Sequence, residues 1–130
     1  MIVLDASALL AMLFGEPGAD EVHETLGAAV MSVANLAEVA AKYRDLGLSS
    51  SDLVAQVPRL GIAVEDVTVE DAVLQADVRE RDVLGSAGRP QLSLGDRLCI
   101  ALASRRGLPV LTADRAWDRL ELGVRVIQLR

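Results

Sequence analysis

The sequence predicts an α/β protein with a mainly parallel central sheet that helices cover on both faces. Three observations support this fold class. Short apolar runs, such as IVL at residues 2–4, alternate with longer segments of helical periodicity. Most of these runs are apolar throughout, as in parallel strands that are buried on both faces. Of the 130 residues, 52% are hydrophobic and 2% aromatic, so we expect an aliphatic core and a single domain over residues 1–130.

The first part of the chain predicts two strands separated by two helices. IVL at 2–4 is the first strand, and a helix over Ser7–Phe14 continues until the turn residues GEPG at 15–18. A short acidic helix near 18–27 then leads to AAVMS at 28–32, which predicts the second strand. This alternation of strands and helices favours parallel pairing.

The middle of the chain predicts three helices and one strand. Residues 33–46 have helical periodicity, and Gly47 is suited to cap the end of that helix. Another helix is predicted over Ser49–Arg59. IAVEDV at 62–67 alternates apolar and polar residues like a strand, and a further helix is predicted over 70–84.

The last part of the chain predicts a loop, a long helix and a closing strand–helix–strand segment. GSAGRPQL at 85–92 has the composition of a loop, and the helix over 94–106 is ended by Gly107. The closing strand, short helix and strand are predicted at 109–112, 114–121 and 125–129. In such sheets, ligands bind outside the carboxyl ends of the strands, where the strand order switches.

Charge is distributed unevenly along the chain. The net charge of -6 argues against a generic nucleic-acid binder, but residues 79–119 carry 8 arginines against 5 acidic residues. Singly, these arginines are expected on solvated helix faces; as a set, they can line one side of a groove for an anionic substrate. No run approaches the ~18 apolar residues that span a bilayer, and MIVLDASALL lacks the basic start of a signal peptide. With Cys99 as the single cysteine, we expect a cytoplasmic protein without membrane association.

Four acidic residues occupy positions that suggest chemistry. Asp5 and Asp114 follow predicted strands at their carboxyl ends, Asp96 begins the helix over 94–106, and Glu38 lies within the helix over 33–46. Each also has a structural explanation. The first two are possible N-caps, Asp96 and Ser93 have the spacing of a capping box, and Glu38 can pair with Lys42. Asp5 favours function, because a lone charge interrupts the most apolar segment of the chain.

If these four carboxylates converge, their repulsion raises their pKa values unless a cation compensates. One or two Mg²⁺ or Mn²⁺ ions suit such oxygen ligands, whereas zinc favours histidine and cysteine. Two ions ~3.5–4 Å apart can clamp the attacking and leaving oxygens of a phosphodiester. The residues therefore predict metal-dependent phosphodiester hydrolysis. Phosphate-binding glycine loops are absent from the sequence, and Lys42, the only lysine, comes too early for a receiver domain.

Four segments in the same order resemble the motifs of PIN-domain ribonucleases, and most closely the VapC-type toxins of toxin–antitoxin pairs. The segments are IVLDASALLAML at 2–13, SVANLAEV at 32–39, LSLGDRLCIALA at 92–103 and VLTADRAW at 110–117. The resemblance covers nearly the whole chain. It implies a three-layer α/β/α sandwich with a mainly parallel sheet, and an endoribonuclease site that binds Mg²⁺ or Mn²⁺.

The resemblance also assigns roles to individual residues. It implies catalytic and metal-binding roles for Asp5, Glu38, Asp96 and Asp114. Supporting roles follow for the polar residues near them, Ser7, Asn35, Thr112 and Asp118. The arginines that we expect to contact the RNA backbone are Arg79, Arg81, Arg89, Arg97 and Arg115.

The resemblance further implies the substrate and partners. Related toxins act on structured RNA, often transfer or ribosomal RNA, form homodimers, and are neutralised by a cognate VapB-type antitoxin. Two other functions stay open from the sequence. One is an RNA-processing PIN nuclease that is not a toxin, and the other is a non-catalytic regulatory module that binds metal or phosphate.

Overall fold

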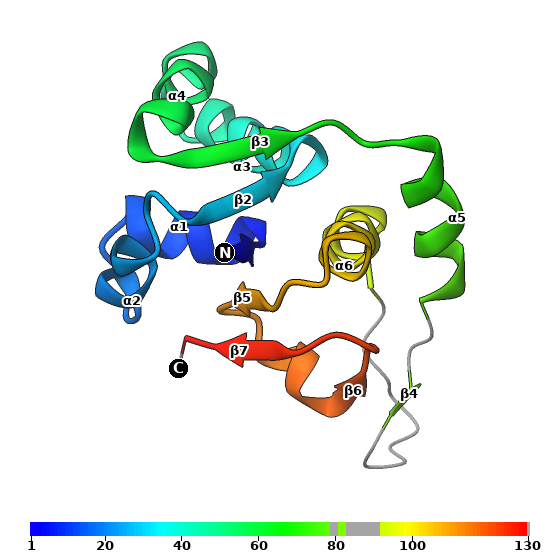
Figure 1. The fold of residues 1–130 in the computed structure, drawn as a ribbon. Helices are drawn as coiled ribbons and strands as arrows, with labels where there is room; N and C mark the ends of the chain where they lie inside the picture. The colour runs from blue at the N-terminus through cyan, green and yellow to red at the C-terminus, as the bar shows by residue number, and fades with distance from the viewer. Residues whose placement is uncertain (79–80, 83–91, 130) are drawn as a thin grey trace.

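The computed structural model describes residues 1–78, 81–82 and 92–129, and it contains a five-stranded sheet (Figure 1). The strand order is β3-β2-β1-β5-β7, and each neighbouring pair is parallel. The bounds of these strands are β1 (Ile2–Leu4), β2 (Ala29–Ser32), β3 (Ile62–Glu65), β5 (Val110–Thr112) and β7 (Val126–Gln128). The parallel sheet predicted from the sequence is therefore confirmed.

Helices cover both faces of this sheet and produce three layers. The first four helices pack on one face, whereas α6 packs on the other face with α5 against it (Figure 1). The bounds of the helices are α1 (Ala6–Leu13), α2 (Ala19–Glu24), α3 (Val33–Asp45), α4 (Ser50–Gln56), α5 (Val69–Asp77) and α6 (Leu94–Arg106). The α/β/α sandwich implied by the resemblance is confirmed.

Neighbouring residues of the central strands point to different cores, because side chains alternate across a strand. On β1, Val3 belongs to the core beneath α6, together with Ile100, whereas Leu4 belongs to the core beneath α1. On β5, Val110 likewise belongs to the core beneath α6, and Leu111 belongs to the core beneath α1. The continuous apolar runs in the sequence are thus explained by strands with two buried faces.

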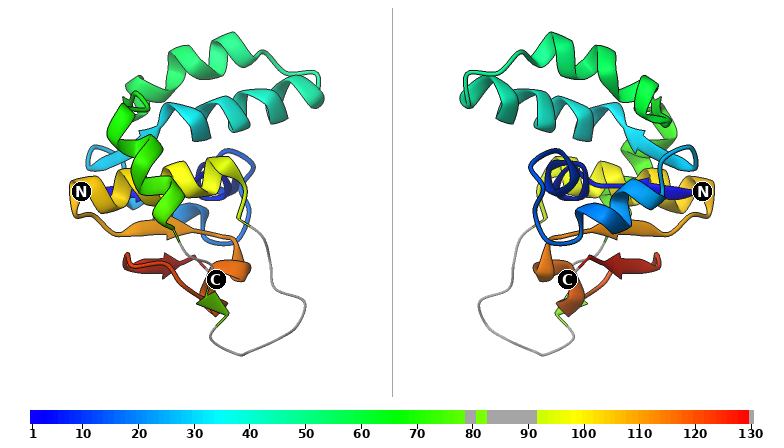
Figure 2. Two further views of the ribbon diagram at one scale, coloured as in Figure 1. Left: turned by 90° about the vertical axis from the view of Figure 1, so that its right-hand side faces the viewer. Right: turned by 90° about the vertical axis from the view of Figure 1, so that its left-hand side faces the viewer.

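Helix ends agree closely with the expected stop and start signals. Ser32 begins α3 by accepting a hydrogen bond from the Ala34 amide at 3.2 Å. Gly107 caps α6 with φ 63°, and Gly47 follows α3 with φ 77°, so both adopt the left-handed conformation that favours glycine. Helices α3 and α4 pack side by side as a hairpin (Figure 2).

Three predicted helices differ from the structure. The helix predicted over 70–84 is wrong at Val78, which is extended, and at β4 (Arg81–Asp82), which pairs antiparallel with β6 (Leu120–Glu121). The rest of that prediction, at 79–80 and 83–84, lies outside the described residues. The helix predicted over 114–121 is a 3-10 helix, η2 (Arg115–Arg119), followed by that strand. The helix predicted over 49–59 divides into α4 and a 3-10 helix, η1 (Val57–Leu60), where Pro58 supplies no amide hydrogen.

Two predictions about the chain can be set beside these ranges. The loop predicted over 85–92 lies outside the described residues, except for Leu92. Within the described ranges, no helix has the length and hydrophobicity required to cross a bilayer.

Candidate active site

The carboxyl ends of β1 and β5 meet at the point where the strand order switches. From β1 the chain adds β2 and β3 on one side, and it returns later to add β5 and β7 on the other side. Asp5 directly follows β1, and Asp114 lies two residues beyond β5. These two acids therefore lie at the edge where parallel α/β sheets bind their ligands.

Asp5 is a buried carboxylate held by three hydrogen-bond donors. It begins α1, where its Oδ1 accepts from the Ala8 amide at 2.9 Å and from the Ser7 hydroxyl at 2.7 Å. The Thr112 hydroxyl donates to Oδ2 at 2.6 Å. Burial raises the pKa of Asp5 to about 6; the three donors oppose this rise, and the charge of Asp96 adds to it.

Ser7 and Thr112 connect Asp5 to the end of β5. Their hydroxyl oxygens lie 3.2 Å apart, and the Ser7 oxygen accepts from the Ala113 amide at 2.9 Å. The Thr112 oxygen accepts from the amide of Asp114 at 3.0 Å. Both predicted supporting residues thus lie in one network that fixes the two loops carrying Asp5 and Asp114.

Asp114 and Asp96 each take part in a helix cap. The Asp114 carboxylate accepts from the Ala116 amide at 2.9 Å at the start of η2. Asp96 accepts from the Ser93 amide at 3.1 Å through Oδ2, and Ser93 accepts from the Asp96 amide at 3.1 Å. Burial raises the pKa of Asp96; the hydrogen bonds with Ser93 oppose this rise, and the charge of Asp114 adds to it. The capping box suggested by the sequence is confirmed.

Glu38 approaches these acids from α3. Its carboxylate lies directly against Gly95, in the first turn of α6. No ion pair between Glu38 and Lys42 is found among the described residues. Partial burial raises the pKa of Glu38, and the negative charges of Asp96 and then Asp5 raise it further. One turn earlier, the buried Asn35 donates from Nδ2 to the Gly95 carbonyl at 3.1 Å. Both residues thus connect α3 to the start of α6.

Electrostatic interactions link the four acids, and their effects are seen in the pKa values of Asp5, Glu38 and Asp96. The charge of Asp96 acts on Asp5 and Glu38, that of Asp5 acts on Glu38, and that of Asp114 acts on Asp96. We refer to Asp5, Glu38, Asp96 and Asp114 as the acidic site. Sequence reasoning missed Gly95 as part of its surroundings; the available signal was a glycine inside a predicted helix, where glycine is unfavourable.

The acidic site has the donor chemistry of a hydrated divalent cation. All four of its charged side chains offer carboxylate oxygens. Within the described ranges, however, no three His, Cys, Asp or Glu side chains are grouped so that they could hold a metal ion together. Magnesium fits this arrangement, because it keeps several waters and is often held by one or two carboxylates plus substrate phosphates.

The other described candidate residues lie on η2 and α6. Asp118 is exposed on η2, and Arg115 is exposed beside Asp114. Arg97 donates to the carbonyl of Val78 at 2.8 Å, so it holds α6 to the end of α5. The side chains of three predicted RNA-contacting arginines lie outside the described part of the chain: Arg79, Arg81 and Arg89.

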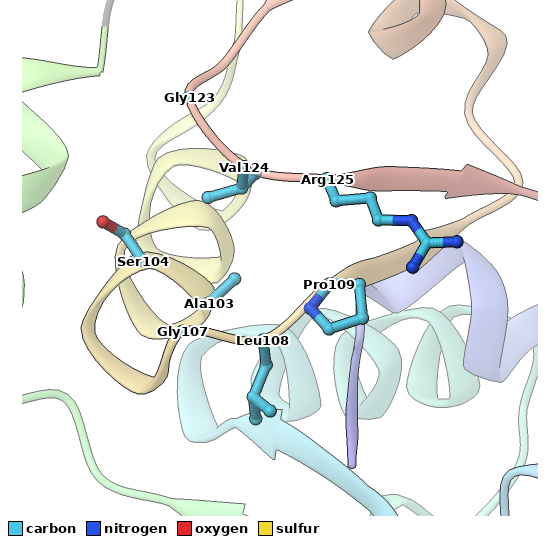
Figure 3. A pocket seen from close by; sticks show the side chains of 8 residues that line it. All are labelled: Ala103, Ser104, Gly107, Leu108, Pro109, Gly123, Val124 and Arg125. Carbon is cyan, nitrogen blue, oxygen red and sulfur yellow. The ribbon is translucent and has the colours of Figure 1, made fainter.

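A separate pocket lies at the opposite edge of the sheet, beside the amino ends of β5 and β7 (Figure 3). Its volume is about 400 Å³. Its lining combines the end of α6 with two loops: Ala103, Ser104, Gly107, Leu108, Pro109, Gly123, Val124 and Arg125. Because it contains none of the four acids, we place the candidate active site at the carboxyl edge instead.

Comparison with known proteins identifies the family of this chain. A family model described as PIN domain matches residues 2–122. A search of curated sequences found no relative.

Three solved structures illustrate the similarity of the fold. A toxin–antitoxin complex from Klebsiella pneumoniae has 15% identity and a TM-score of 0.74, covering 100% of this chain and 98% of that chain. DNA-bound VapBC from Salmonella typhimurium has 20% identity and a TM-score of 0.69, with 100% of both chains covered. A Mycobacterium tuberculosis VapC toxin that cleaves the sarcin–ricin loop has 17% identity and a TM-score of 0.65, covering 91% and 93%. At these identities the similarity concerns the fold.

Proposed function

Because the chain belongs to the PIN domain family, we propose that it is a metal-dependent endoribonuclease toxin of the VapC type. The observation that carries the proposal is the acidic site, where the negative charges of neighbouring acids raise the pKa values of Asp5, Glu38 and Asp96. Such a concentration of negative charge is costly in a folded protein unless a cation offsets it. Hydrolysis of a phosphodiester bond uses a cation at this kind of site.

Within this proposal, Asp5 and Asp96 hold Mg²⁺ or Mn²⁺, with Glu38 and Asp114 beside them. When bound, the ion lowers the pKa of water and stabilises negative charge on the phosphodiester oxygens. The hydroxyls of Ser7 and Thr112 fix the Asp5 carboxylate through their hydrogen bonds. The pKa of the Glu38 carboxylate is raised, so it is suited to accept a proton from the attacking water.

We propose structured RNA as the substrate, with transfer or ribosomal RNA as the first candidates. One neighbour in the fold comparison is a toxin that cleaves the sarcin–ricin loop. We expect Arg115, which is exposed and follows Asp114 in sequence, to contact an RNA phosphate near the site. Arg97 is less suited to this role, because its guanidinium already donates to a backbone carbonyl.

We also propose a cognate antitoxin and a homodimeric toxin. The antitoxin proposal is supported by neighbours solved as a toxin–antitoxin complex and as DNA-bound VapBC. The toxin proposal predicts an adjacent reading frame that encodes a small protein. Co-expression of that protein should restore the growth of cells that express this chain. The absence of such a reading frame would favour an RNA-processing nuclease of the same fold.

The function can be tested with purified protein, cellular RNA and either Mg²⁺ or Mn²⁺. We expect site-specific cleavage that EDTA abolishes. Asp5→Asn and Asp96→Asn should each lower the rate by at least about 100-fold while circular dichroism stays unchanged. Asp52→Asn is the matched control, since Asp52 lies in the first turn of α4 and is exposed. Equal cleavage by the wild type and both site variants would refute the site. Mn²⁺ binding without cleavage would indicate a regulatory module.

A further inference from the structure

A contact between α3 and α6 depends on the missing side chain of Gly95. A Cβ atom placed at Gly95 would overlap Oε1 of Glu38 and would lie 2.6 Å from its Cδ. Real Cβ atoms do not approach other heavy atoms this closely. The Glu38 carboxylate therefore occupies the space that any larger residue at position 95 would need.

The backbone at Gly95 does not explain why a glycine is there. Gly95 lies within α6, and it is not among the described glycines that have positive φ. A helical glycine is less favourable than alanine, because it loses more conformational freedom on folding. What glycine supplies at this position is space beside the helix, and Glu38 fills that space.

Asn35 holds the same residue from the neighbouring turn of α3. Its Nδ2 donates to the Gly95 carbonyl at 3.1 Å, and its side chain is 1% exposed. Its Oδ1 is buried without a hydrogen-bond partner among the described residues. One face of α3 thus contacts Gly95 twice, through the amide of Asn35 and the carboxylate of Glu38.

We propose that Gly95 is a positioning residue, whose missing side chain holds the Glu38 carboxylate beside Asp96 and Asp5. This inference rests on the proposed function, because it concerns the geometry of the same site. Asp96 directly follows Gly95 in sequence, so the turn that carries one acid also sets the position of another. The end of a glutamate side chain moves easily. A Cβ at position 95 should therefore displace the carboxylate without unfolding the helix.

The main test compares two alanine substitutions at opposite ends of α6. Gly95→Ala should leave Tm in EDTA unchanged or raise it by about 2 °C, because alanine favours the helix. It should weaken Mn²⁺ binding measured by calorimetry, and lower kcat for RNA with little change in KM, each by about 10-fold or more. Gly107→Ala is the matched control. It should lower Tm by about 3 °C, because φ is 63° there, and leave Mn²⁺ affinity and kcat unchanged.

A double-mutant cycle tests whether Gly95 acts through Glu38. Adding Gly95→Ala to Glu38→Ala should cause no further loss of Mn²⁺ affinity or kcat, since the displaced carboxylate is already absent. The inference is overturned if Gly95→Ala binds Mn²⁺ and cleaves RNA like the wild type. The inference is also overturned if Gly95→Ala lowers Mn²⁺ affinity and kcat by the same factor in the Glu38→Ala background as in the wild type.

Crystal structures of metal-free wild type and Gly95→Ala separate this inference from the proposed function. We expect the Glu38 carboxylate to move away from α6 while the backbones of α3 and α6 stay in place. A shift of α6 with Glu38 unmoved would refute the positioning role. A wild type that neither binds Mn²⁺ nor cleaves RNA would refute the proposed function, and the two structures would still decide how Gly95 places Glu38.

Discussion

Asp5 is the N-cap residue of α1, and it is also the most buried carboxylate of the acidic site. Three donors hold it, yet burial keeps its pKa at about 6. Stabilisation by hydrogen bonds is therefore smaller than the cost of removing the charge from water. A protein keeps such a residue where function requires the charge.

Asp5→Asn should stabilise the metal-free protein at pH 7. The pKa rises from 3.8 to about 6 on folding, and each pKa unit corresponds to ~1.4 kcal/mol. Because asparagine loses some accepted hydrogen bonds, we expect a net gain of about 1–2 kcal/mol in the free energy of unfolding. Denaturant unfolding in EDTA measures it. A variant less stable than the wild type would show that the hydrogen bonds of Asp5 outweigh its burial.

Thr112→Val should destabilise the protein through the site network. The substitution removes the donor to Asp5 at 2.6 Å and the acceptor of the Asp114 amide at 3.0 Å. We expect a loss of about 2 kcal/mol, because one of the bonds involves a charged acceptor. Thr25→Val is the matched control, since the Thr25 hydroxyl donates to the Val22 carbonyl and makes no other hydrogen bond with the described residues. Thermal unfolding should show the smaller loss for the control; equal losses would contradict the prediction.

At the scale of elements, an ion pair joins α5 to α6. Asp71 accepts from Nε of Arg105 at 2.8 Å and forms a capping box with Thr68. Burial alone would raise the pKa of Asp71, but the hydrogen bonds from Arg105 and Thr68 outweigh it, so the pKa is lowered. Asp71 therefore contributes stability above its unfolded pKa, and this stability is lost as the pH falls through the folded pKa.

Asp71→Asn should accordingly destabilise the fold at pH 7 by about 2–4 kcal/mol, because it leaves Arg105 without its partner. Asp45→Asn is the control. It removes an exposed pair with Arg44, and the expected cost is below about 1 kcal/mol. Chemical denaturation of both variants measures the difference. If Asp71→Asn is no worse than Asp45→Asn, α5 does not depend on this ion pair.

Elements with strong local signals could be predicted from the sequence. The helix over 94–106 agrees at both ends, because Ser93 and Gly107 supply its caps. The helix predicted over 70–84 extends too far, because helical periodicity does not reveal that residues 81–82 pair with a strand far along the chain. Long-range pairing of this kind is set by tertiary contacts.

Four candidate acids could be chosen from the sequence, but the contacts that arrange them could not be predicted. Strand ends identified Asp5 and Asp114, and a carboxylate on an apolar helix face identified Asp96. The contact of Glu38 with Gly95 joins residues 57 positions apart. No local pattern encodes such a contact, since it depends on how α3 crosses α6.

For the molecule as a whole, the acidic site makes stability depend on pH. Asp5, Glu38 and Asp96 all have raised pKa values, so near pH 5 the folded state binds more protons than the unfolded chain. Stability then falls as the pH rises from about 4 to about 6 and changes little above that. Asp71 acts in the opposite direction at lower pH, because its pKa is lowered.

The metal-free protein should therefore have a higher Tm at pH 5 than at pH 7.5, and Mn²⁺ should reduce the difference. At pH 7.5, above the pKa of about 6 of Asp5, its carboxylate is charged and the ion offsets its repulsion with neighbouring acids, so saturating Mn²⁺ should raise Tm there. At a free Mn²⁺ concentration of 100 times the dissociation constant, the gain in the free energy of unfolding is ~2.7 kcal/mol. At pH 5, protons compete with the ion, and the gain should be smaller. Thermal unfolding with EDTA or Mn²⁺ at both pH values provides the measurement, and Asp5→Asn should flatten the metal-free profile. Equal gains at the two pH values would mean that the ion binds away from the acidic site.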